Sequence, residues 1–155
     1  MIKFVHGDPF ASDIDIRVNT VNCVGVMGKG IALEFKLLYP RMFHAYCELC
    51  RGGVLKPGNL HIWYRPNDGE WIINIATKDH WRDPSQYEWV QAGLLALRRY
   101  LKPLGPQIVS LPALGCANGG LEWKRVKRMI VAALIDVDAT VRVYSPVGAR
   151  NGRPV

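Results

Sequence analysis

Strand-like and helix-like patterns of hydrophobic residues alternate along the chain. Apolar and β-branched residues at alternating positions predict strands at residues 2–6 and 14–21, near the N-terminus. Apolar residues spaced three or four positions apart instead predict helices over residues 31–39 and 42–50. Pro40 separates these helices, because proline disfavours helical geometry in the residue before it. The first part of the chain therefore predicts two strands followed by a helical hairpin.

The rest of the chain continues this alternation. Two turn-forming segments rich in proline, glycine and asparagine each lead into a short strand, which indicates a pair of adjacent strands. The predicted elements that follow the first hairpin are strands 61–64 and 71–75, a helix that starts at Pro84-Ser85 and runs to residue 102, strand 107–111, helix 122–135 and strand 140–144. Strands that alternate with helices favour an α/β fold, with a mixed sheet covered on both faces.

Length and composition are those of one globular domain. The chain has 155 residues, of which 49% are hydrophobic and 21% charged, and we expect residues 1–155 to form a single domain. The longest apolar run, residues 129–135, is far shorter than the roughly 18 residues of a membrane span. The first ten residues also lack the apolar stretch of a signal peptide. We therefore expect a cytoplasmic protein without a membrane partner.

The chain is basic, with a formal charge of +7 and a pI near 9.4. A positive surface attracts polyanions such as nucleic acid. Charge alone does not separate this case from a basic protein that has no such partner. The basic residues of the last predicted helix are candidates for DNA contact, although a solvated helix face is the more common explanation of such a run: Lys124, Arg125, Lys127 and Arg128.

The four cysteines do not suggest a disulfide framework or a metal site. They lie at positions 23, 47, 50 and 116, too few and too unevenly spaced for a secreted disulfide scaffold. Cys47 and Cys50 form a CxxC pair with His44 nearby, but structural zinc sites usually combine two such pairs. We predict a reducing compartment, and neither a metal nor a cofactor.

Two glycine-rich segments, residues 22–30 and 115–120, each follow a predicted strand and precede a predicted helix. Glycine lets the backbone approach an anion, and loop amides together with a helix N-terminus can then bind phosphate. Neither segment matches a known nucleotide-binding fingerprint, and either could be only a tight turn. Both lie at the carboxyl ends of strands, where ligands bind in open α/β sheets. Their joint presence predicts a site for a phosphate-containing ligand.

Four polar residues at strand ends are candidates for ligand contact or catalysis. Asp8 could accept a hydrogen bond from an exocyclic amine such as that of adenine, or be a turn residue or helix cap, which is the more common role of aspartate before proline. Asn19 and Asn22 end an otherwise apolar strand, where asparagine serves either a ligand or loop capping. Lys78 could stabilise charge, donate a proton, form a Schiff base, or be an ordinary solvated lysine.

Long stretches of the sequence resemble the macrodomains of the DarG family. They are residues 18–36, Thr77-Lys78 with His80-Trp81-Arg82, and residues 111–123. DarG proteins are the antitoxins of DarT/DarG pairs and belong to the same branch as the terminal ADP-ribose protein glycohydrolases. The resemblance implies a three-layer α/β/α macrodomain, with a mixed, mostly parallel sheet, that binds ADP-ribose. It also implies a glycohydrolase that removes ADP-ribose from a base of single-stranded DNA and so reverses a DarT-like toxin.

The resemblance implies a position for each part of the ligand. Asp8 would lie near adenine, residues 115–120 around the diphosphate, and residues 22–30 around the distal ribose. The full set of expected ADP-ribose-binding residues is Gly7, Asp8, Pro9, Asn19, Asn22, Cys23, Gly25, Val26, Met27, Gly28, Gly30, Thr77, Pro112, Leu114, Gly115, Cys116, Ala117, Asn118, Gly119, Gly120, Leu121 and Tyr144. The expected partners are ADP-ribose, ADP-ribosylated single-stranded DNA and a DarT-like toxin, bound by a monomer.

Lys78 matches the catalytic lysine of the family. In the glycohydrolase relatives this lysine works with an aspartate of the second glycine loop, where this chain has Gly119. We therefore expect Lys78 to stabilise charge on the departing base while water attacks, and Asn22 to orient the distal ribose or that water. A carboxylate placed at position 119 is expected to weaken binding by repelling the diphosphate.

Two other functions stay open: a non-catalytic reader of ADP-ribose marks, and a hydrolase of protein-linked ADP-ribose. Because the chain ends soon after the last predicted strand, the resemblance also implies that it lacks the toxin-binding C-terminal region of DarG antitoxins. It would then be an excised domain or a stand-alone relative.

Overall fold

One six-stranded β-sheet forms the centre of the part described by the computed structural model, which is residues 1–146. Its strands are β1 (Ile2–Val5), β2 (Ile16–Val21), β3 (Leu60–Arg65), β4 (Glu70–Ala76), β5 (Ile108–Pro112) and β6 (Thr140–Tyr144). Their order across the sheet is β1-β6-β5-β2-β4-β3. Only β3 and β4 pair antiparallel; the other neighbouring strands are parallel. The sheet is mixed and mostly parallel, as predicted.

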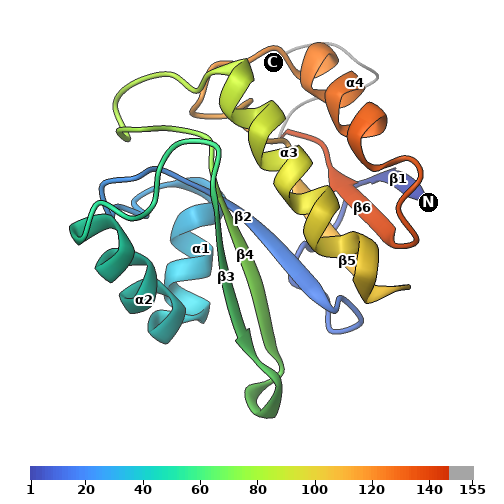
Figure 1. Cartoon of the computed structure of the whole chain (residues 1–155), viewed down its shortest axis with the longest axis horizontal. Helices are drawn as coiled ribbons and strands as arrows, with labels where there is room; N and C mark the ends of the chain where they lie inside the picture. The colour runs from blue at the N-terminus through green and yellow to red at the C-terminus, as the bar shows by residue number, and fades with distance from the viewer. Residues whose placement is uncertain (147–155) are drawn as a thin grey trace.

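Helices cover both faces of this sheet (Figure 1). The helices are α1 (Gly30–Leu38), α2 (Pro40–Arg51), α3 (Tyr87–Leu101) and α4 (Trp123–Leu134), with short 3-10 helices η1 (Pro66–Asp68) and η2 (Lys102–Leu104). α1 and α2 pack on one face, and α3 and α4 on the other. The predicted three-layer α/β/α architecture is confirmed.

The alternation of side chains along the strands produces two separate hydrophobic cores. In β4, Ile73 and Ile75 join the core beneath α3 and α4, whereas Ile72 and Ala76 join the core beneath α1 and α2. All four side chains are fully buried, because successive strand residues point to opposite faces of a sheet that is covered on both sides.

Gly93 allows α3 to lie close against the sheet. A Cβ atom at this position would come within 2.4 Å of Ile75 Cγ2, well inside normal contact distance. A residue that lacks Cβ is therefore required where the helix crosses β4.

Two predicted helix boundaries are wrong. α2 begins at Pro40 and not at residue 42, because proline is well suited to the first helical position. α3 begins at Tyr87 and not at Pro84-Ser85. The Ser85 N–H donates to the Gly119 carbonyl oxygen at 3.0 Å. This bond ties residue 85 to a loop that is distant in sequence, so the helix begins after it.

None of the helices within residues 1–146 is both long and apolar enough to cross a membrane.

Candidate active site

Three loops meet at one edge of the sheet. The first glycine loop (residues 22–30) follows β2, the second glycine loop (residues 113–122) follows β5, and the loop at residues 77–86 follows β4. β2 lies between β4 and β5 and runs parallel to both. The carboxyl ends of the three strands therefore lie together, which is where ligands bind in open α/β sheets.

Direct contacts join these loops. The Cys23 N–H donates to the Asp79 carbonyl oxygen at 3.0 Å, which ties the first glycine loop to the β4–α3 loop. A Cβ built on Gly30 would lie 3.6 Å from Asn118 Nδ2. The two glycine-rich segments, although far apart in sequence, thus line the same site.

Asn22 holds the first glycine loop in shape. Its side chain is almost fully buried, and its Oδ1 accepts hydrogen bonds from the Val24 N–H at 3.0 Å and the Tyr46 hydroxyl at 2.9 Å. Its Nδ2 donates to the Val26 carbonyl oxygen at 2.7 Å. Because an amide carries two N–H donors, one remains for another partner.

The second glycine loop folds tightly around Ser85. A Cβ at Gly119 would lie 2.4 Å from the Gly115 carbonyl oxygen and 2.3 Å from Ser85 Oγ. The Ser85 side chain is buried, and its hydroxyl has no hydrogen-bond partner among the described residues. This serine was predicted only as a helix start. Its position inside the loop could not be read from the sequence, because its neighbours come from residues about 30 positions away.

The outer turn of the second glycine loop has free backbone donors. Within residues 1–146, the N–H groups of residues 117–120 donate no hydrogen bond to another protein atom. Ala117, Asn118 and Gly120 are also exposed. Successive unpaired N–H groups in a turn can bind an anion, so this turn has the local chemistry that a diphosphate requires.

Lys78 connects the β4–α3 loop with the second glycine loop. Its Nζ donates to the Trp81 carbonyl oxygen at 3.0 Å and to the Asn118 carbonyl oxygen at 2.9 Å. An ammonium group has three N–H donors, so one is left for a ligand. Partial burial, together with the charge of Lys29, holds the pKa of Lys78 below its usual value, while Asp83 acts in the opposite direction.

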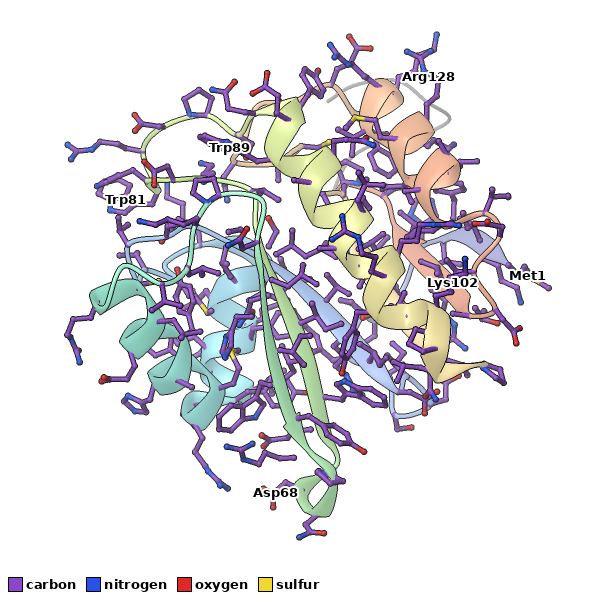
Figure 2. The ribbon with its side chains drawn as sticks, viewed as in Figure 1. Met1, Asp68, Trp81, Trp89, Lys102 and Arg128 are labelled. Atoms are coloured by element: carbon purple, nitrogen blue, oxygen red, sulfur yellow. The ribbon has the colours of Figure 1, made fainter. Side chains whose placement is uncertain are left out.

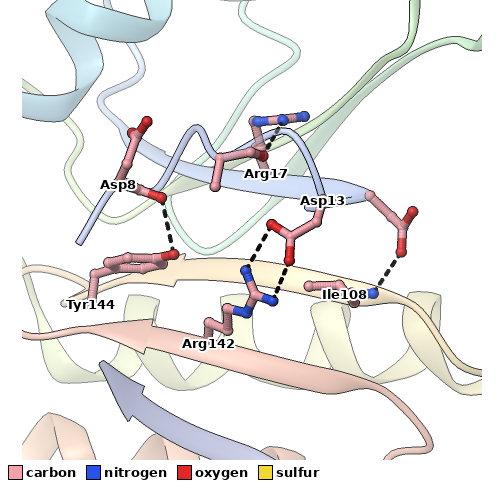
Figure 3. A network of polar contacts seen from close by, with 8 residues as sticks. Asp8, Asp13, Arg17, Ile108, Arg142 and Tyr144 are labelled. Carbon is pink, nitrogen blue, oxygen red and sulfur yellow. Dashed lines mark hydrogen bonds and ion pairs between the residues drawn. The ribbon is translucent and has the colours of Figure 1, made fainter. Parts of the chain in front are cut away.

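Asp8 lies in an anchored segment between β1 and β2 (Figure 3). Its Oδ1 accepts a hydrogen bond from the Phe10 N–H at 2.8 Å, as in a turn, and the Tyr144 hydroxyl donates to its carbonyl oxygen at 3.1 Å. Asp13 of the same segment forms a two-bond ion pair with Arg142 on β6. The exposed Asp8 side chain keeps Oδ2 without a donor among the described residues, so it is available to a ligand amine.

Comparison with known proteins assigns the fold to a family. Residues 18–130, most of the chain, match the family model described as Macro domain. The chain belongs to the macrodomain family. It is 46% identical over 153 residues to a DNA ADP-ribosyl glycohydrolase of Mycobacterium tuberculosis (strain ATCC 25618 / H37Rv), which covers 96% of this chain and 43% of that protein.

Solved macrodomains have the same architecture. The macrodomain of Mycobacterium tuberculosis DarG superposes with a TM-score of 0.86 at 42% identity, covering 94% of this chain and 98% of that chain. Thermosipho africanus DarTG, solved in complex with ADP-ribose, superposes with a TM-score of 0.88 at 29% identity, covering 96% of this chain and 42% of that chain. The chain spans less than half the length of the curated DNA ADP-ribosyl glycohydrolases that it matches.

The expected ligand-binding residues of this macrodomain fall into three groups by exposure. The exposed ones are Gly7, Asp8, Val26, Gly28, Gly30, Ala117, Asn118 and Gly120. Pro9, Cys23, Gly25, Cys116, Leu121 and Tyr144 are half-buried. The buried ones are Asn19, Asn22, Met27, Thr77, Pro112, Leu114, Gly115 and Gly119. Their contact with ADP-ribose stays a prediction.

Asn19 belongs to a buried polar chain on the α1 and α2 side of the sheet. It is fully buried, and its Nδ2 donates to Asn74 Oδ1 at 3.1 Å. Asn74 Nδ2 in turn lies 3.0 Å from His61 Nδ1. Burial lowers the pKa of His61, which favours a neutral ring that accepts this bond. The polar residues at this strand end therefore include an internal network as well as site residues.

Cys23, Cys47 and Cys50 pack together at the first glycine loop, whereas Cys116 lies in the second glycine loop. All four are free and half-buried, and burial raises the pKa of Cys23 and of Cys116 to about 12. At neutral pH these two thiols are therefore protonated and poor nucleophiles. Residues 1–146 contain no group of three or more potential ligand side chains that could hold a metal ion.

Proposed function

We propose that this chain is a glycohydrolase that removes ADP-ribose from a base of single-stranded DNA, reversing modification by a DarT-like toxin. The observation that carries the proposal is the position of Lys78. Its ammonium group bonds to the second glycine loop at Asn118 and keeps one N–H donor free. Support comes from the similarity to DNA ADP-ribosyl glycohydrolases and to a DarTG protein solved with ADP-ribose.

The chemical step in this proposal is displacement of the base by water. Water attacks the anomeric carbon of the distal ribose, and the bond to the base breaks with its electron pair leaving on the base. The proton lost by the water is taken up by the departing base. A cation held in place beforehand stabilises the charge that develops on the departing group. This stabilisation raises the rate of the reaction by roughly two to three powers of ten. Lys78 supplies that cation, since two backbone carbonyls fix its position.

Gly119 favours this electrostatic role over a covalent one. An aspartate at this position, which the resemblance implies for the glycohydrolase relatives, can move protons. In this chain the loop has no room for a side chain at position 119 unless it opens, because a Cβ there would lie 2.4 Å from the Gly115 carbonyl oxygen. Without that carboxylate, a Schiff base on Lys78 lacks its proton carrier. Borohydride treatment of the enzyme with substrate should then give no stable adduct.

Asn22 acts mainly as a positioning residue. Three of its hydrogen bonds set the conformation of the first glycine loop, which is proposed to surround the distal ribose. Its second Nδ2 hydrogen is the donor with which it would orient the ribose or the attacking water.

The proposal includes a single macrodomain that acts as a monomer in the cytoplasm. All four cysteines are free thiols, the state that cysteines keep in a reducing compartment. A DarT-like transferase is the proposed source of the modified DNA, because one relative is a fusion of DNA ADP-ribosyl transferase and DNA ADP-ribosyl glycohydrolase.

The test is incubation with an ADP-ribosylated single-stranded oligonucleotide, with release of free ADP-ribose followed over time. ADP-ribosylated protein is assayed in parallel, and Lys78→Ala is the matched variant. Release from DNA that depends on Lys78 supports the proposal, whereas release from protein alone refutes it. Binding of ADP-ribose without release from either substrate would identify a reader, which the missing carboxylate at position 119 favours as the second candidate.

A further inference from the structure

Trp81 is an unusually exposed aromatic residue beside the proposed active site. It is 53% exposed, whereas Trp63 is buried and the other three tryptophans are half-buried. Figure 2 shows it at the outer edge of the molecule, on the β4–α3 loop. Its backbone carbonyl accepts a hydrogen bond from Lys78, so its ring projects from the loop that holds the catalytic candidate.

The neighbours of the Trp81 ring are a polar side chain and a cationic side chain. The His80 ring lies 5.2 Å from it, and the Arg82 guanidinium lies 5.9 Å from its centroid. Arg82 also contacts His80 through its backbone N–H and its guanidinium, each at 3.3 Å. These contacts restrict the three consecutive side chains, so the flat surface of the indole is held in place at little further cost in entropy on binding.

Exposed apolar side chains continue onto the neighbouring loop. Val24 and Val26 of the first glycine loop are 43% and 41% exposed, and the Cys23 N–H ties that loop to Asp79. Lys29 and Lys78 add positive charge, partly offset by Asp79 and Asp83. The edge of the site therefore combines an aromatic face, apolar surface and cations.

The end of α4 that carries Arg128 does not adjoin this surface. Arg128 and Trp81 lie on opposite sides of the molecule in Figure 2, with α3 between them. Two of the basic side chains of α4 instead cover aromatic rings, Arg125 on Tyr87 and Lys127 on Phe4. DNA contact through Arg128 would therefore lie away from Trp81.

We infer that Trp81, held by His80 and Arg82, is a stacking platform for a nucleotide base next to the ADP-ribosylated base. This inference rests on the proposed function. An exposed indole binds unpaired bases of any sequence because every base has a π-face, and nearby cations attract the phosphate backbone. In a single strand, the neighbouring base is one nucleotide from the modified base. Trp81 lies on the same loop as Lys78, so it is placed to meet that neighbouring base.

The inference is tested with Trp81→Ala, Trp81→Phe and the control Tyr64→Ala. Tyr64 is also an exposed aromatic residue, at 48%, but lies on β3 near the hairpin at the opposite end of the sheet (Figure 1). Three quantities are measured: affinity for unmodified single-stranded oligonucleotide, KM and kcat for ADP-ribosylated oligonucleotide, and affinity for ADP-ribose. Melting temperatures show that each variant is folded.

Trp81→Ala is expected to bind the oligonucleotide roughly 5- to 150-fold more weakly, the range that one stacked base contributes. KM for modified DNA should rise with it, kcat should change far less, and affinity for ADP-ribose should be retained. Trp81→Phe should recover most of the lost affinity for the oligonucleotide, and Tyr64→Ala should bind it as tightly as the wild-type chain does.

Unchanged DNA affinity and KM in Trp81→Ala would overturn the inference while leaving the proposed function intact. An equal effect on ADP-ribosylated protein, without one on DNA, would also overturn it and point to a protein partner. If the wild-type chain releases no ADP-ribose from DNA, the proposed function fails, and the oligonucleotide affinities of the same variants still decide whether Trp81 is a stacking platform.

Discussion

Replacing Gly119 by alanine is expected to disrupt the second glycine loop without adding any charge. The new Cβ would lie 2.4 Å from the Gly115 carbonyl oxygen and 2.3 Å from Ser85 Oγ. Because ordinary contacts lie beyond 3.4 Å, the loop has to open by about 1 Å. The Gly115 contact is with backbone, so no change of side-chain rotamer relieves it.

Overpacking of this kind typically lowers the free energy of unfolding by about 1–3 kcal/mol. At this chain length, each kcal/mol lowers Tm by about 2–4 °C. The same movement displaces the free N–H groups of residues 117–120, so ADP-ribose affinity should fall as well. Gly119→Glu should lose stability and ADP-ribose affinity to a similar extent as Gly119→Ala. The structure thus favours a steric effect at this position over the charge repulsion expected from the sequence.

Thermal unfolding and calorimetry with ADP-ribose measure both effects. Gly28→Ala is the control for stability, because its Cβ would contact only Val26 Cγ1, at 3.6 Å. Adding Ser85→Ala to Gly119→Ala should recover only part of the loss, since the Gly115 oxygen stays in place. The steric reasoning is refuted if Gly119→Ala melts and binds like wild type while Gly119→Glu alone loses affinity.

Four further predictions follow from the same structure. Lys78→Ala should keep its Tm and its ADP-ribose affinity within a few-fold while turnover falls roughly 100- to 1000-fold; wild-type turnover in this variant would remove Lys78 from the mechanism. Because the pKa of Lys78 is lowered by burial and by Lys29, the rate should fall as pH rises through that pKa, and Lys29→Met should move the fall to higher pH; a rate that rises instead would indicate a neutral amine. Gly93→Ala should lower the free energy of unfolding by about 1–3 kcal/mol in urea titrations, since its Cβ would meet Ile75 Cγ2 at 2.4 Å; full stability would show that α3 can shift freely. Affinity for single-stranded DNA should fall as salt rises, as expected for a basic protein of formal charge +7; an affinity independent of salt would exclude the electrostatic contribution.

The fold could be predicted from local patterns because each pattern reports which face of an element is buried. A nearly continuous apolar run, such as that of β4, requires a sheet covered on both sides. Helical spacing between the strands supplies the layers that cover it. The errors, at Pro40 and Pro84-Ser85, concern helix ends. Proline permits a helix start in both places: α2 uses it at Pro40, whereas the bond from Ser85 to Gly119 keeps residues 84–85 out of α3.

The chemistry of the candidate site was partly visible in the sequence. Glycine loops that follow strands, and a lysine directly after β4, were sufficient to select the residues that meet at one edge of the sheet. These signals are local, since they depend on residue type and on the element that comes before. They do not reveal which loops become neighbours.

Only the tertiary structure decided how those residues are used. Lys78 bonds to Asn118, 40 positions away, and Ser85 fills the space that a side chain at Gly119 would need. Asn19 faces the interior and bonds to Asn74 across a strand pair. Each outcome follows from the strand order β5-β2-β4, which brings distant loops together. The local sequence determines which residues end a strand, whereas the packing of the whole sheet determines what each of them contacts.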